Sequence, residues 1–481
     1  MGLVRLNAAT LREANAGVER PAYDRASTCI GIVHFGPGAF HRAHQADYID
    51  QLLGADPRWA ISAVSLRSAS VREALAPQDC LYTRVELGSE VRYRVIGAIR
   101  EVLTAPEQPQ AVLARLSAPQ TRFVTLTVTE AGYCLDAGSR LDVSHPDIAH
   151  DLTQPQAPRS AIGWLTNGLR ARRAAGVPPF IVLSCDNLPA NGPTLHAALT
   201  DFAGRIDSEL ARWIETQVVC PRTMVDSITP ATDAPLRAQV AAAVGLQDAW
   251  PVQREAFRQW VIEDLPAVRE LDWRSIGVTL AADVALYERA KLRLLNGAHS
   301  TLAYAGLLRN HITVREAMAD RDLAGFVERL MREDIAASLN PSGGFDTGGY
   351  IDALLTRFRN PGLKHQLAQI AWDGSKKLPA RLGAVFEEAL AAGRPLHRLT
   401  VPLAAWMRFI ARQARAGVPI VDPQAGTLAS LGAACRGVAE ADVERFLSLG
   451  GMLSAELRAS ASFKSALIHA YGELGGGGLP L

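Results

Sequence analysis

The sequence lacks the features of disulfide-stabilised, zinc-binding and membrane-spanning proteins. Its six cysteines stand far apart among 481 residues and form no Cys-x-x-Cys pair, which argues against a disulfide framework and a cysteine-rich zinc site. No segment reaches the ~18 consecutive apolar residues of a membrane span, and the N-terminus lacks the long apolar stretch of a signal peptide. We therefore expect a cytoplasmic protein that does not bind a membrane.

An imbalance of charge is also missing. The formal net charge is +1, with 21% charged and 48% hydrophobic residues. Nucleic acids and anionic membranes attract proteins through an extended basic field, so we expect neither as a partner. The length exceeds what one ordinary hydrophobic core accommodates, and two domains are expected.

The first half of the chain alternates short apolar, β-branched segments with helical patterns. Such strands, separated by helices, are typical of a parallel sheet that is buried on both faces. The pattern predicts a doubly wound α/β domain over residues 1–282. Its predicted strands are 29–35, 59–66, 122–130 and 179–187, and a helix is predicted over 157–176.

The second half, from residue 283, has the leucine and alanine content of helices and no convincing strand. We predict a mostly α-helical domain over 283–481 that begins with a long helix at 283–310. Further helices are predicted over 314–337, 349–358, 363–371, 377–392, 399–416 and 440–457.

A glycine turn follows the first predicted strand, in "GIVHFGPGAFHRAH" (31–44). Gly36 and Gly38 let the backbone approach a pyrophosphate, and the N-terminus of the next helix favours an anion. The third glycine of the dinucleotide fingerprint would fall at His41, so the match is incomplete. A tight strand-to-helix turn without a ligand is the alternative interpretation.

The end of the second predicted strand lacks the carboxylate that usually binds the ribose of NAD. Arg67, Ser68 and Ser70 stand there, and the first acid is Glu73. This segment therefore does not decide whether the cofactor is NAD or NADP. Glu130, Asp186 and Asn187 follow later strands, where α/β sheets bind ligands; for Asp186 we favour a structural cap.

The stretch "KLRLLNGAHS" (291–300) places three polar residues in an apolar helical pattern. At about 100° per residue, His299 and Asn296 lie near 80° and 140° from Lys291, so the three share one arc. Burial lowers the pKa of a lysine and suits it for proton transfer. Asparagine and histidine can donate hydrogen bonds to a growing oxyanion.

Two other classes of protein are alternatives to a dinucleotide-dependent enzyme that uses Lys291, Asn296 and His299. A metal-dependent hydrolase would need His34, His41 and His44 to converge, but their positions on a strand end and a helix start predict diverging rings. A non-catalytic dinucleotide-binding module would keep the glycine turn and lose the 291–299 constellation, which is present here.

Seven motifs, spread in order over almost the whole chain, resemble the long-chain polyol dehydrogenase family. This resemblance implies an expanded Rossmann-type domain followed by a mostly α-helical domain, a nicotinamide cofactor and no metal. The motifs are "GxGxFHRAHQ" (36–45), "TxTExGYC" (127–134), "SCDNLPxNG" (184–192), "MVDxITP" (224–230), "QWVIED" (259–264), "KLRLLNGAHS" (291–300) and "IAWDGSKKLPAR" (370–381).

The resemblance also implies roles for individual residues. Lys291 matches a general acid/base, Asn187 and Asn296 match an oxyanion pocket, and His299 matches a ligand of the reacting oxygen and substrate hydroxyl. Substrate contacts are implied for Asp226, Lys377 and Glu130. If the segment is helical, Arg381 lies four residues beyond Lys377 on the same face, and we expect it to bind the substrate as well. The residues expected at the cofactor are Phe35, Gly36, Gly38, Ala39, Phe40 and Arg67.

Some segments are more similar to the fructuronate reductase branch of the family than to its mannitol branch. Lys376 stands where many relatives have glutamine, and Gln369 stands where some mannitol enzymes have arginine. We expect NAD-dependent interconversion of D-fructuronate and D-mannonate, with mannitol 2-dehydrogenase activity as the alternative. The expected partner is a small sugar acid or polyol. NADP, and a monomer or a small homo-oligomer, remain open.

Overall fold

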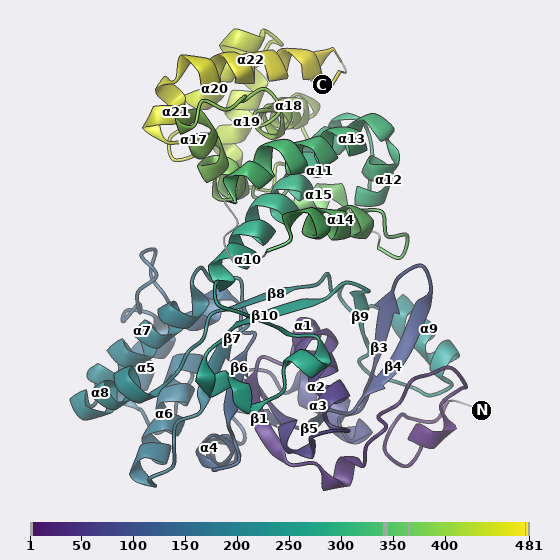
Figure 1. The fold of residues 1–481 in the computed structure, drawn as a ribbon, viewed down its shortest axis with the longest axis vertical. Coiled ribbons are helices and arrows are strands. Elements are labelled where there is room, and N and C mark those ends of the chain that lie inside the picture. Colours follow the sequence, from purple (N-terminus) through teal and green to yellow (C-terminus); the bar gives the residue numbers. More distant parts are fainter. Residues whose placement is uncertain (1–2, 340–344, 364, 477, 480–481) are drawn as a thin grey trace. The chain divides into compact units, whose positions relative to one another are not determined.

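The chain forms two compact units, Met1–Ala285 and Leu286–Leu481, in a computed structural model (Figure 1). The sequence prediction placed this boundary between residues 282 and 283. The structure describes residues 3–339, 345–363, 365–476 and 478–479. Within these ranges, no helix has the length and apolar character needed to span a membrane.

A five-stranded parallel sheet forms the centre of the N-terminal unit, in the order β5-β2-β1-β6-β7. The strand order reverses between β1 and β6, which is the switch point where such sheets bind ligands. The predicted doubly wound α/β class is confirmed. The strands are β1 (Ile30–Phe35), β2 (Ala60–Ser65), β5 (Ile99–Thr104), β6 (Phe123–Leu126) and β7 (Ile181–Ser184).

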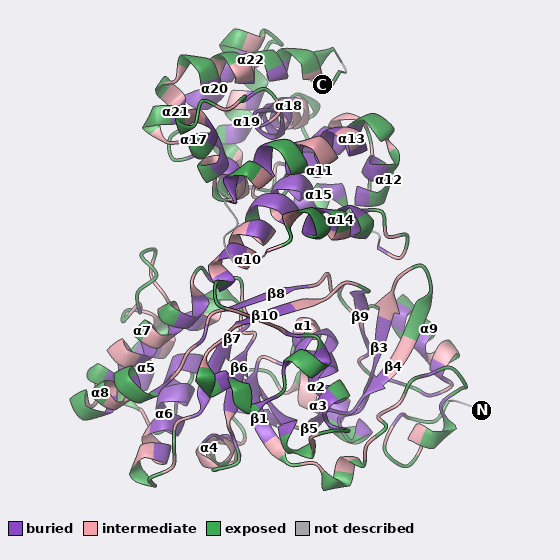
Figure 2. Ribbon diagram, in the orientation of Figure 1, coloured by how far each residue is buried: buried purple, intermediate pink, exposed green. Residues whose placement is uncertain are grey.

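Successive side chains of these strands enter two different hydrophobic layers. Ile32 packs on one face of the sheet and Val33 on the other, as do Phe123 and Val124. Figure 2 shows the strands buried beneath their covering helices. These helices are α1 (Ala39–Ala43), α2 (Gln45–Leu52), α3 (Ser70–Leu75), α4 (Pro109–Ser117), α5 (Pro146–Thr153), α6 (Ala161–Ala174), α7 (Asn191–Gly204) and α8 (Ser208–Gln217).

Two small sheets that the sequence interpretation missed complete the N-terminal unit. One has the order β4-β3-β9 and the other β11-β10-β8. In both, parallel and antiparallel pairs occur together. Their elements are β3 (Tyr82–Leu87), β4 (Val91–Ile96), β8 (Thr223–Asp226), β9 (Val252–Glu255), β10 (Gln259–Glu263) and β11 (Thr279–Ala281), with α9 (Ala234–Val244) beside β4.

The described part of the C-terminal unit is helical, as predicted. Its long first helix is interrupted by a π-helical segment, and two further π segments follow. The α-helices are α10 (Val284–Ala290), α11 (Gly297–Leu308), α12 (Val314–Ala319), α13 (Arg321–Arg329), α14 (Thr347–Phe358), α15 (Leu367–Ile370), α16 (Gly374–Leu378), α17 (Ala384–Ala391), α18 (Val401–Ala416), α19 (Ala425–Ala434), α20 (Ala439–Leu447), α21 (Ala455–Ala459) and α22 (Ala461–Gly475); the π segments are η8 (Lys291–Asn296), η9 (Leu330–Ile335) and η11 (Pro379–Gly383).

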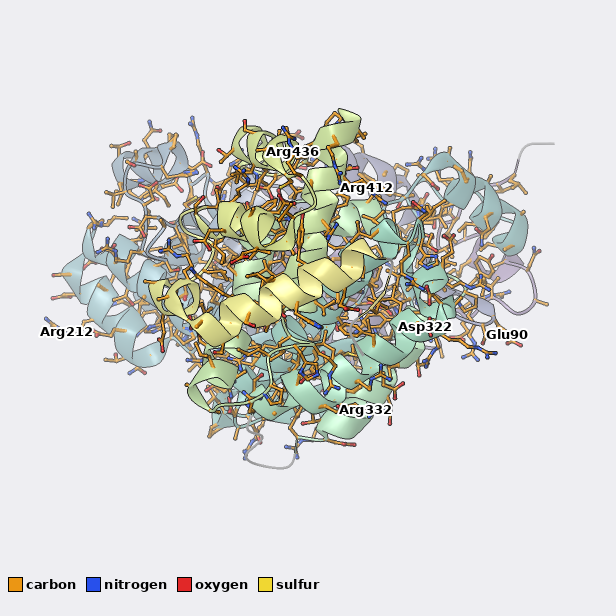
Figure 3. All side chains as sticks on the ribbon, turned by 90° about the horizontal axis from the view of Figure 1, so that it is seen from above. Glu90, Arg212, Asp322, Arg332, Arg412 and Arg436 are labelled. Atoms are coloured by element: carbon orange, nitrogen blue, oxygen red, sulfur yellow. The ribbon has the colours of Figure 1, made fainter. Side chains whose placement is uncertain are left out.

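Helix α11 lies in the core of this unit, and residues 297–306 are all buried. It packs on α18, which also contacts α19 and α22. Charged side chains such as Asp322, Arg332 and Arg436 lie on the outside, as Figure 3 shows. Burial of a whole helix explains why α11 reads as apolar on every side.

Several predicted helices of this unit are shorter than expected. Asp320 caps a new helix by accepting bonds from the backbone N–H groups of Asp322 and Leu323, so the predicted 314–337 helix is broken. The predicted 440–457 helix ends at Leu447. Of the predicted 363–371 helix, the structure shows only α15, and residue 364 lies outside the described residues. Helices α19 and α22 were not predicted.

Three buried histidines make the N-terminal unit sensitive to acid. Burial lowers the pKa of His34 and His44 to about 3 and that of His41 well below its usual value. These rings stay neutral in the folded chain, but in the unfolded chain they take up protons below pH ~6.5. Proton uptake favours the unfolded chain, so the free energy of unfolding decreases as the pH is lowered below ~6.5.

When the pH is lowered from 7.5 to 5.5, the free energy of unfolding should decrease in both proteins. We expect the decrease to be about 1.4 kcal/mol smaller in His34→Gln than in the parent, because one buried histidine is missing. Urea unfolding, followed by tryptophan fluorescence at several pH values, gives the slope of the unfolding free energy against pH for both proteins. His469→Gln, at an exposed position, serves as the control and should keep the parental slope. Equal slopes for His34→Gln and the parent would contradict this assignment.

Candidate active site

A pocket of about 520 Å³ lies at the switch point of the parallel sheet. The segments that follow β1, β2 and β6 all contribute to it. Gly36, Gly38 and Arg67, which the sequence predicted to contact a cofactor, line this pocket. Other lining residues are Pro37, Ser65, Leu66, Ser68, Ser70, Val71, Thr127, Val128, Thr129, Ala131, Gly132, Cys134, His145, Asp147, Arg159, Ser160 and Ala161.

The glycine turn has a backbone shape that only glycine adopts easily. Gly36 has φ +88°, and a Cβ placed on it would lie 2.2 Å from the carbonyl oxygen of Thr127. The Thr127 hydroxyl donates to the Gly36 carbonyl over 2.8 Å. His34 Nε2 lies 3.2 Å from the same carbonyl oxygen and 3.0 Å from the Thr127 hydroxyl. The turn is therefore held against the end of β6.

Gly38 has a different task in the same turn. A Cβ added to it would meet only the Gly36 carbonyl oxygen, 3.9 Å away, so its α-carbon borders open pocket space. Gly38 is also the N-cap of α1, and the first N–H groups of a helix have no partner within the helix and can face an anion. The turn therefore fits a dinucleotide phosphate approaching the backbone closely.

The two glycines predict two different mutant phenotypes. Gly36→Ala should lower the folding stability by several kcal/mol because of the backbone clash and the positive φ. Gly38→Ala should fold normally and weaken dinucleotide binding, because its methyl group enters the pocket. Thermal unfolding and NADH titration separate the two effects; a fully stable Gly36→Ala protein would contradict this geometry.

Three of the predicted cofactor residues, Phe35, Ala39 and Phe40, do not line the pocket. Phe35 is fully buried in the sheet core, and Phe40 stacks on His44 with ring centroids 4.8 Å apart. Ala39 begins α1. Arg67 is exposed and forms an ion pair of 2.8 Å with Asp147, a residue that the sequence interpretation did not single out.

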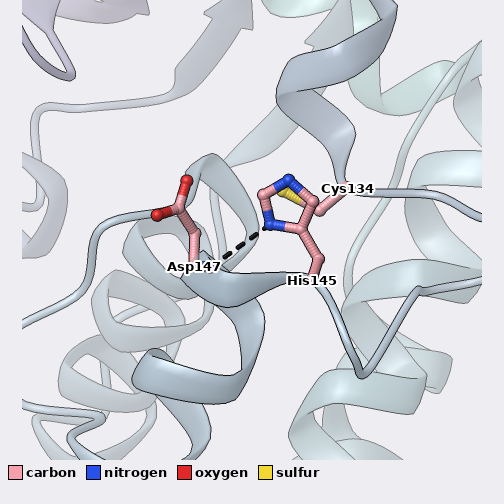
Figure 4. Close-up of side chains that lie close together, drawn as sticks. All are labelled: Cys134, His145 and Asp147. Carbon is pink, nitrogen blue, oxygen red and sulfur yellow. Dashed lines mark hydrogen bonds between the residues drawn. The ribbon is translucent and has the colours of Figure 1, made fainter.

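One cluster on the pocket wall has the residue types of a metal site. Cys134, His145 and Asp147 place one ligand atom each within 4.8 Å of one another (Figure 4). However, burial raises the pKa of the Cys134 thiol to about 11, whereas metals bind the thiolate. His145 Nδ1 accepts a bond from the Asp147 backbone N–H, and the Asp147 carboxylate is paired with Arg67. This chemistry does not favour a metal ion.

The histidines considered for a hydrolase do not converge either. The expectation that all three rings diverge was wrong for His34 and His41, which stack with centroids 3.3 Å apart and planes 11° apart. Their nitrogens therefore lie in parallel planes and do not point at one ion. His44 Nε2 lies 3.0 Å from the carbonyl oxygen of Gln259.

Residues 186 and 187, after β7, have contrasting surroundings. The Asp186 carboxylate accepts bonds from the backbone N–H groups of Val128 and Thr129 and from the Tyr133 hydroxyl. It therefore ties the end of β7 to the segment after β6, as expected for a structural cap. Asn187 is exposed beyond it. Glu130, in the tied segment, is also exposed.

Asp226 is the last residue of β8 and is 5% exposed. It is paired in register with Gln259 of β10. A rigid β ladder thus fixes its backbone, although this sheet is separate from the central one. The sequence had indicated a site residue here only through the family motif.

Lys291 and Asn296 are the first and last residues of the π segment η8. The predicted arc assumed a regular α-helix, and the π turn changes the angle between these side chains, so that calculation does not describe the observed helix. Lys291 and Asn296 are half-buried, and His299, in the first turn of α11, is buried. Single π turns inside helices occur often at functional sites.

His299 lies in an aromatic and basic environment. Its ring centroid is 4.9 Å from Phe358 and 5.3 Å from His365. Burial lowers the pKa of His299 well below its usual value, and the nearby His365, Arg357 and Arg381 lower it further. The ring is therefore neutral near pH 7 and has one N–H to donate.

Arg381 braces the helix that carries these residues. Its guanidinium donates to the Asn296 carbonyl oxygen over 3.2 Å and to the Ser300 hydroxyl over 2.8 Å. Lys377 is half-buried and lies 3.9 Å from the Asp373 carboxylate. Burial, and then the positive charge of Arg381, lower the pKa of Lys377.

Comparison with known proteins assigns the chain to a family along nearly its whole length. The mannitol dehydrogenase Rossmann domain matches residues 30–275, and the mannitol dehydrogenase C-terminal domain matches residues 283–475.

The chain belongs to the mannitol dehydrogenase family.

The family resemblance, and the oxidoreductase class expected from it, are confirmed. D-mannonate oxidoreductase of Escherichia coli strain K12 is 39% identical over 476 residues, which is 97% of each chain. Mannitol 2-dehydrogenase of Cereibacter sphaeroides is 41% identical over 412 residues, covering 84% of this chain and 86% of that one. The structure of Pseudomonas fluorescens mannitol 2-dehydrogenase, a ternary complex with NAD and D-mannitol, superposes with a TM-score of 0.81 at 37% identity, covering 98% of this chain and 97% of the other.

Proposed function

We propose that this mannitol dehydrogenase family member is an NAD-dependent D-fructuronate reductase, which interconverts D-fructuronate and D-mannonate. The similarity to D-mannonate oxidoreductase, which extends over 97% of both chains, carries this proposal. The switch-point pocket and its glycine turn support a bound dinucleotide. The six free cysteines support a reducing, cytoplasmic location.

The proposed chemistry divides between the cofactor and the protein. A bound nicotinamide supplies the two-electron exchange with the carbinol carbon. Lys291 accepts the proton of the substrate hydroxyl during oxidation and returns it during reduction. The amides of Asn187 and Asn296 and the neutral His299 donate hydrogen bonds to the oxygen while its negative charge grows.

The remaining site residues hold the substrate. Asp226 and Glu130 accept hydrogen bonds from its hydroxyl groups. Lys377 binds the terminal carboxylate that distinguishes a sugar acid from a polyol. Arg381, with two protein acceptors, contributes a nearby positive charge and fixes the Asn296 backbone. Two cations near one carboxylate strengthen its binding when the surroundings exclude water.

Mannitol 2-dehydrogenase activity is the second candidate. The similarity to the Pseudomonas fluorescens enzyme, with a TM-score of 0.81, supports it. The two candidates differ in one chemical feature, because D-fructose lacks the carboxylate of D-fructuronate. The preference for D-fructuronate over D-fructose therefore depends on the positive charges of Lys377 and Arg381.

We expect kcat/KM with D-fructuronate to exceed that with D-fructose by at least ~10-fold, the order of one charge-assisted hydrogen bond. Lys377→Ala should reduce this ratio, and high salt should reduce it modestly because partly buried charges are incompletely screened. NADH oxidation at 340 nm measures both substrates.

The neighbouring Lys376→Ala is the matched control, because Lys376 is exposed, and it should keep the ratio. Equal or better efficiency with D-fructose would contradict the fructuronate proposal and favour the mannitol candidate.

A further inference from the structure

The switch-point pocket has an unusual charge distribution where it passes the end of β2. In sheets of this type, the residues after the second strand face the ribose of the adenosine, and a carboxylate there accepts from both ribose hydroxyls and repels a 2′-phosphate. Here Arg67, Ser68 and Ser70 line the pocket at this position. Two hydroxyl groups and a guanidinium thus replace the carboxylate.

The nearby carboxylate, Asp147, is already neutralised. Its Oδ2 lies 2.8 Å from the Arg67 guanidinium, and the Asp147 side chain is 21% exposed whereas that of Arg67 is 81% exposed. Asp147 is therefore held in the wall while Arg67 reaches into solvent from it.

A second cation stands on the same wall. Arg159 lines the pocket, and its guanidinium makes no hydrogen bond or ion pair to the residues that the structure describes. With Arg67 paired to Asp147, the wall retains one uncompensated positive charge. A charge of this sign attracts a phosphate and gives no reason to exclude one.

The pocket continues past the ion pair into a second cavity of about 550 Å³. Leu66, Arg67, Asp147 and Arg159 line both cavities. The second one adds a mostly apolar surface, which suits a flat adenine ring. Its apolar residues are Ala105, Pro106, Pro109, Ala157, Pro158 and Trp164, and the polar residues that it adds are His150 and Gln154.

We infer that this chain binds NADP(H) as well as NAD(H), with Arg67 as the principal ligand of the 2′-phosphate and Arg159 as the second. Adenine would occupy the apolar cavity, which brings its ribose beside Arg67. The Ser68 and Ser70 hydroxyls, which are 2.9 Å apart, can serve either a phosphate oxygen or a ribose hydroxyl. This arrangement accepts both cofactors because it contains no free carboxylate. The inference rests on the dinucleotide pocket of the proposed function but not on the choice of sugar.

The test is equilibrium binding, which requires no substrate. The intact chain is titrated with NADPH and NADH, using the quenching of tryptophan fluorescence, with Trp164 on the wall of the second cavity as one reporter. We expect the two dissociation constants to lie within ~10-fold of each other, against the larger discrimination that a free carboxylate imposes. NADPH binding should weaken more than NADH binding when salt is raised.

Arg67→Ala should raise the dissociation constant of NADPH by ~10-fold or more and that of NADH by less than ~3-fold, because the guanidinium binds the phosphate through charge-assisted hydrogen bonds. Adenosine 2′,5′-bisphosphate should compete better than 5′-AMP with the parent, and this advantage should disappear in the variant. Inorganic phosphate alone should not compete at the same concentrations.

Two further variants separate this inference from a general loss of structure. Asp147→Asn keeps the side-chain size and removes the opposing charge, so NADPH should bind more tightly while NADH changes little. Arg72→Ala, in α3, removes an arginine that pairs with Glu107 outside both cavities, and it should change neither constant.

NADPH that binds ~100-fold more weakly than NADH to the parent would overturn the inference. A loss of NADH binding in Asp147→Asn would also overturn it, because the carboxylate would then be the ribose ligand. If instead both dinucleotides bind but no sugar acid reacts, the proposed substrate fails and the inference stands.

Discussion

Lys291→Ala is expected to lose ~10²–10⁴-fold in turnover, the range for removal of a general acid/base, while dinucleotide affinity stays nearly unchanged. Lys291 begins the π segment of the C-terminal unit, and the glycine turn and its pocket belong to the N-terminal unit. The substitution removes the proposed proton acceptor, which is not one of the residues proposed to hold the cofactor. NADH titration and steady-state kinetics measure the two quantities separately.

Two neighbouring substitutions make this test specific. Lys291→Arg keeps a positive charge, but a guanidinium does not release its proton in proteins, so turnover should stay low. Leu292→Ala alters the same π segment at a 38% exposed apolar side chain and should remain active. An active Lys291→Arg enzyme would contradict proton transfer by Lys291 and show that a positive charge at this position is sufficient for turnover. Loss of NADH binding with unchanged turnover per bound cofactor would remove Lys291 from the chemistry.

Four of the five strands of the central sheet could be predicted from the sequence because they are buried on both faces. The edge strand β5, Ile99–Thr104, was not predicted, and its residues Arg100 and Glu101 are only half-buried. Segments such as "IGIVHF" and "AISAVS" are apolar almost throughout, and this pattern distinguishes them from the helices that separate them. The predicted strand at 122–130 was too long for a local reason. The backbone N–H groups of Val128 and Thr129 bind the Asp186 carboxylate, and Thr129 has φ +66°, so the ladder ends at Leu126.

The β3–β4 hairpin had a signal that was overlooked. Polar and apolar residues alternate over "RVEL" and "VRYRV" on either side of "GSE", which is typical of an antiparallel hairpin. The strands β8 to β11 are only three to five residues long, and pairing partners distant in sequence define them. Short strands of this kind carry little periodicity, so the sequence could not distinguish them from loops.

The candidate site was only partly predictable, for a similar reason. The polar residues of "KLRLLNGAHS" stand out against their apolar neighbours, but nothing in a single sequence indicates a π turn at that point. The partners of these residues come from distant segments. Arg381 reaches the Asn296 carbonyl oxygen across 85 residues, and Asp147 reaches Arg67 across 80. Such pairs form through tertiary packing, and the periodicity of hydrophobic residues along the sequence gives no information about them.

Asn296→Ala is expected to lower turnover by ~10²–10³-fold, the effect of removing one hydrogen-bond donor from an oxyanion pocket. The substitution spares the helix, because the bond from Arg381 goes to the main-chain oxygen of residue 296 and not to its amide. The loss should therefore appear in kcat more than in the thermal stability of the C-terminal unit.

The nature of the substituted group can be tested at the same position. Asn296→Asp has nearly the same shape but offers an acceptor with negative charge, which repels a developing oxyanion, so it should be no more active than Asn296→Ala. Ser300→Ala removes the other acceptor of Arg381 and leaves the amide in place, and it should lower turnover far less. If Ser300→Ala and Asn296→Ala were equally impaired, the packing around Arg381 would account for the loss. A fully active Asn296→Ala enzyme would contradict the proposed oxyanion role of this amide, because the loss of a donor that stabilises the transition state slows the reaction.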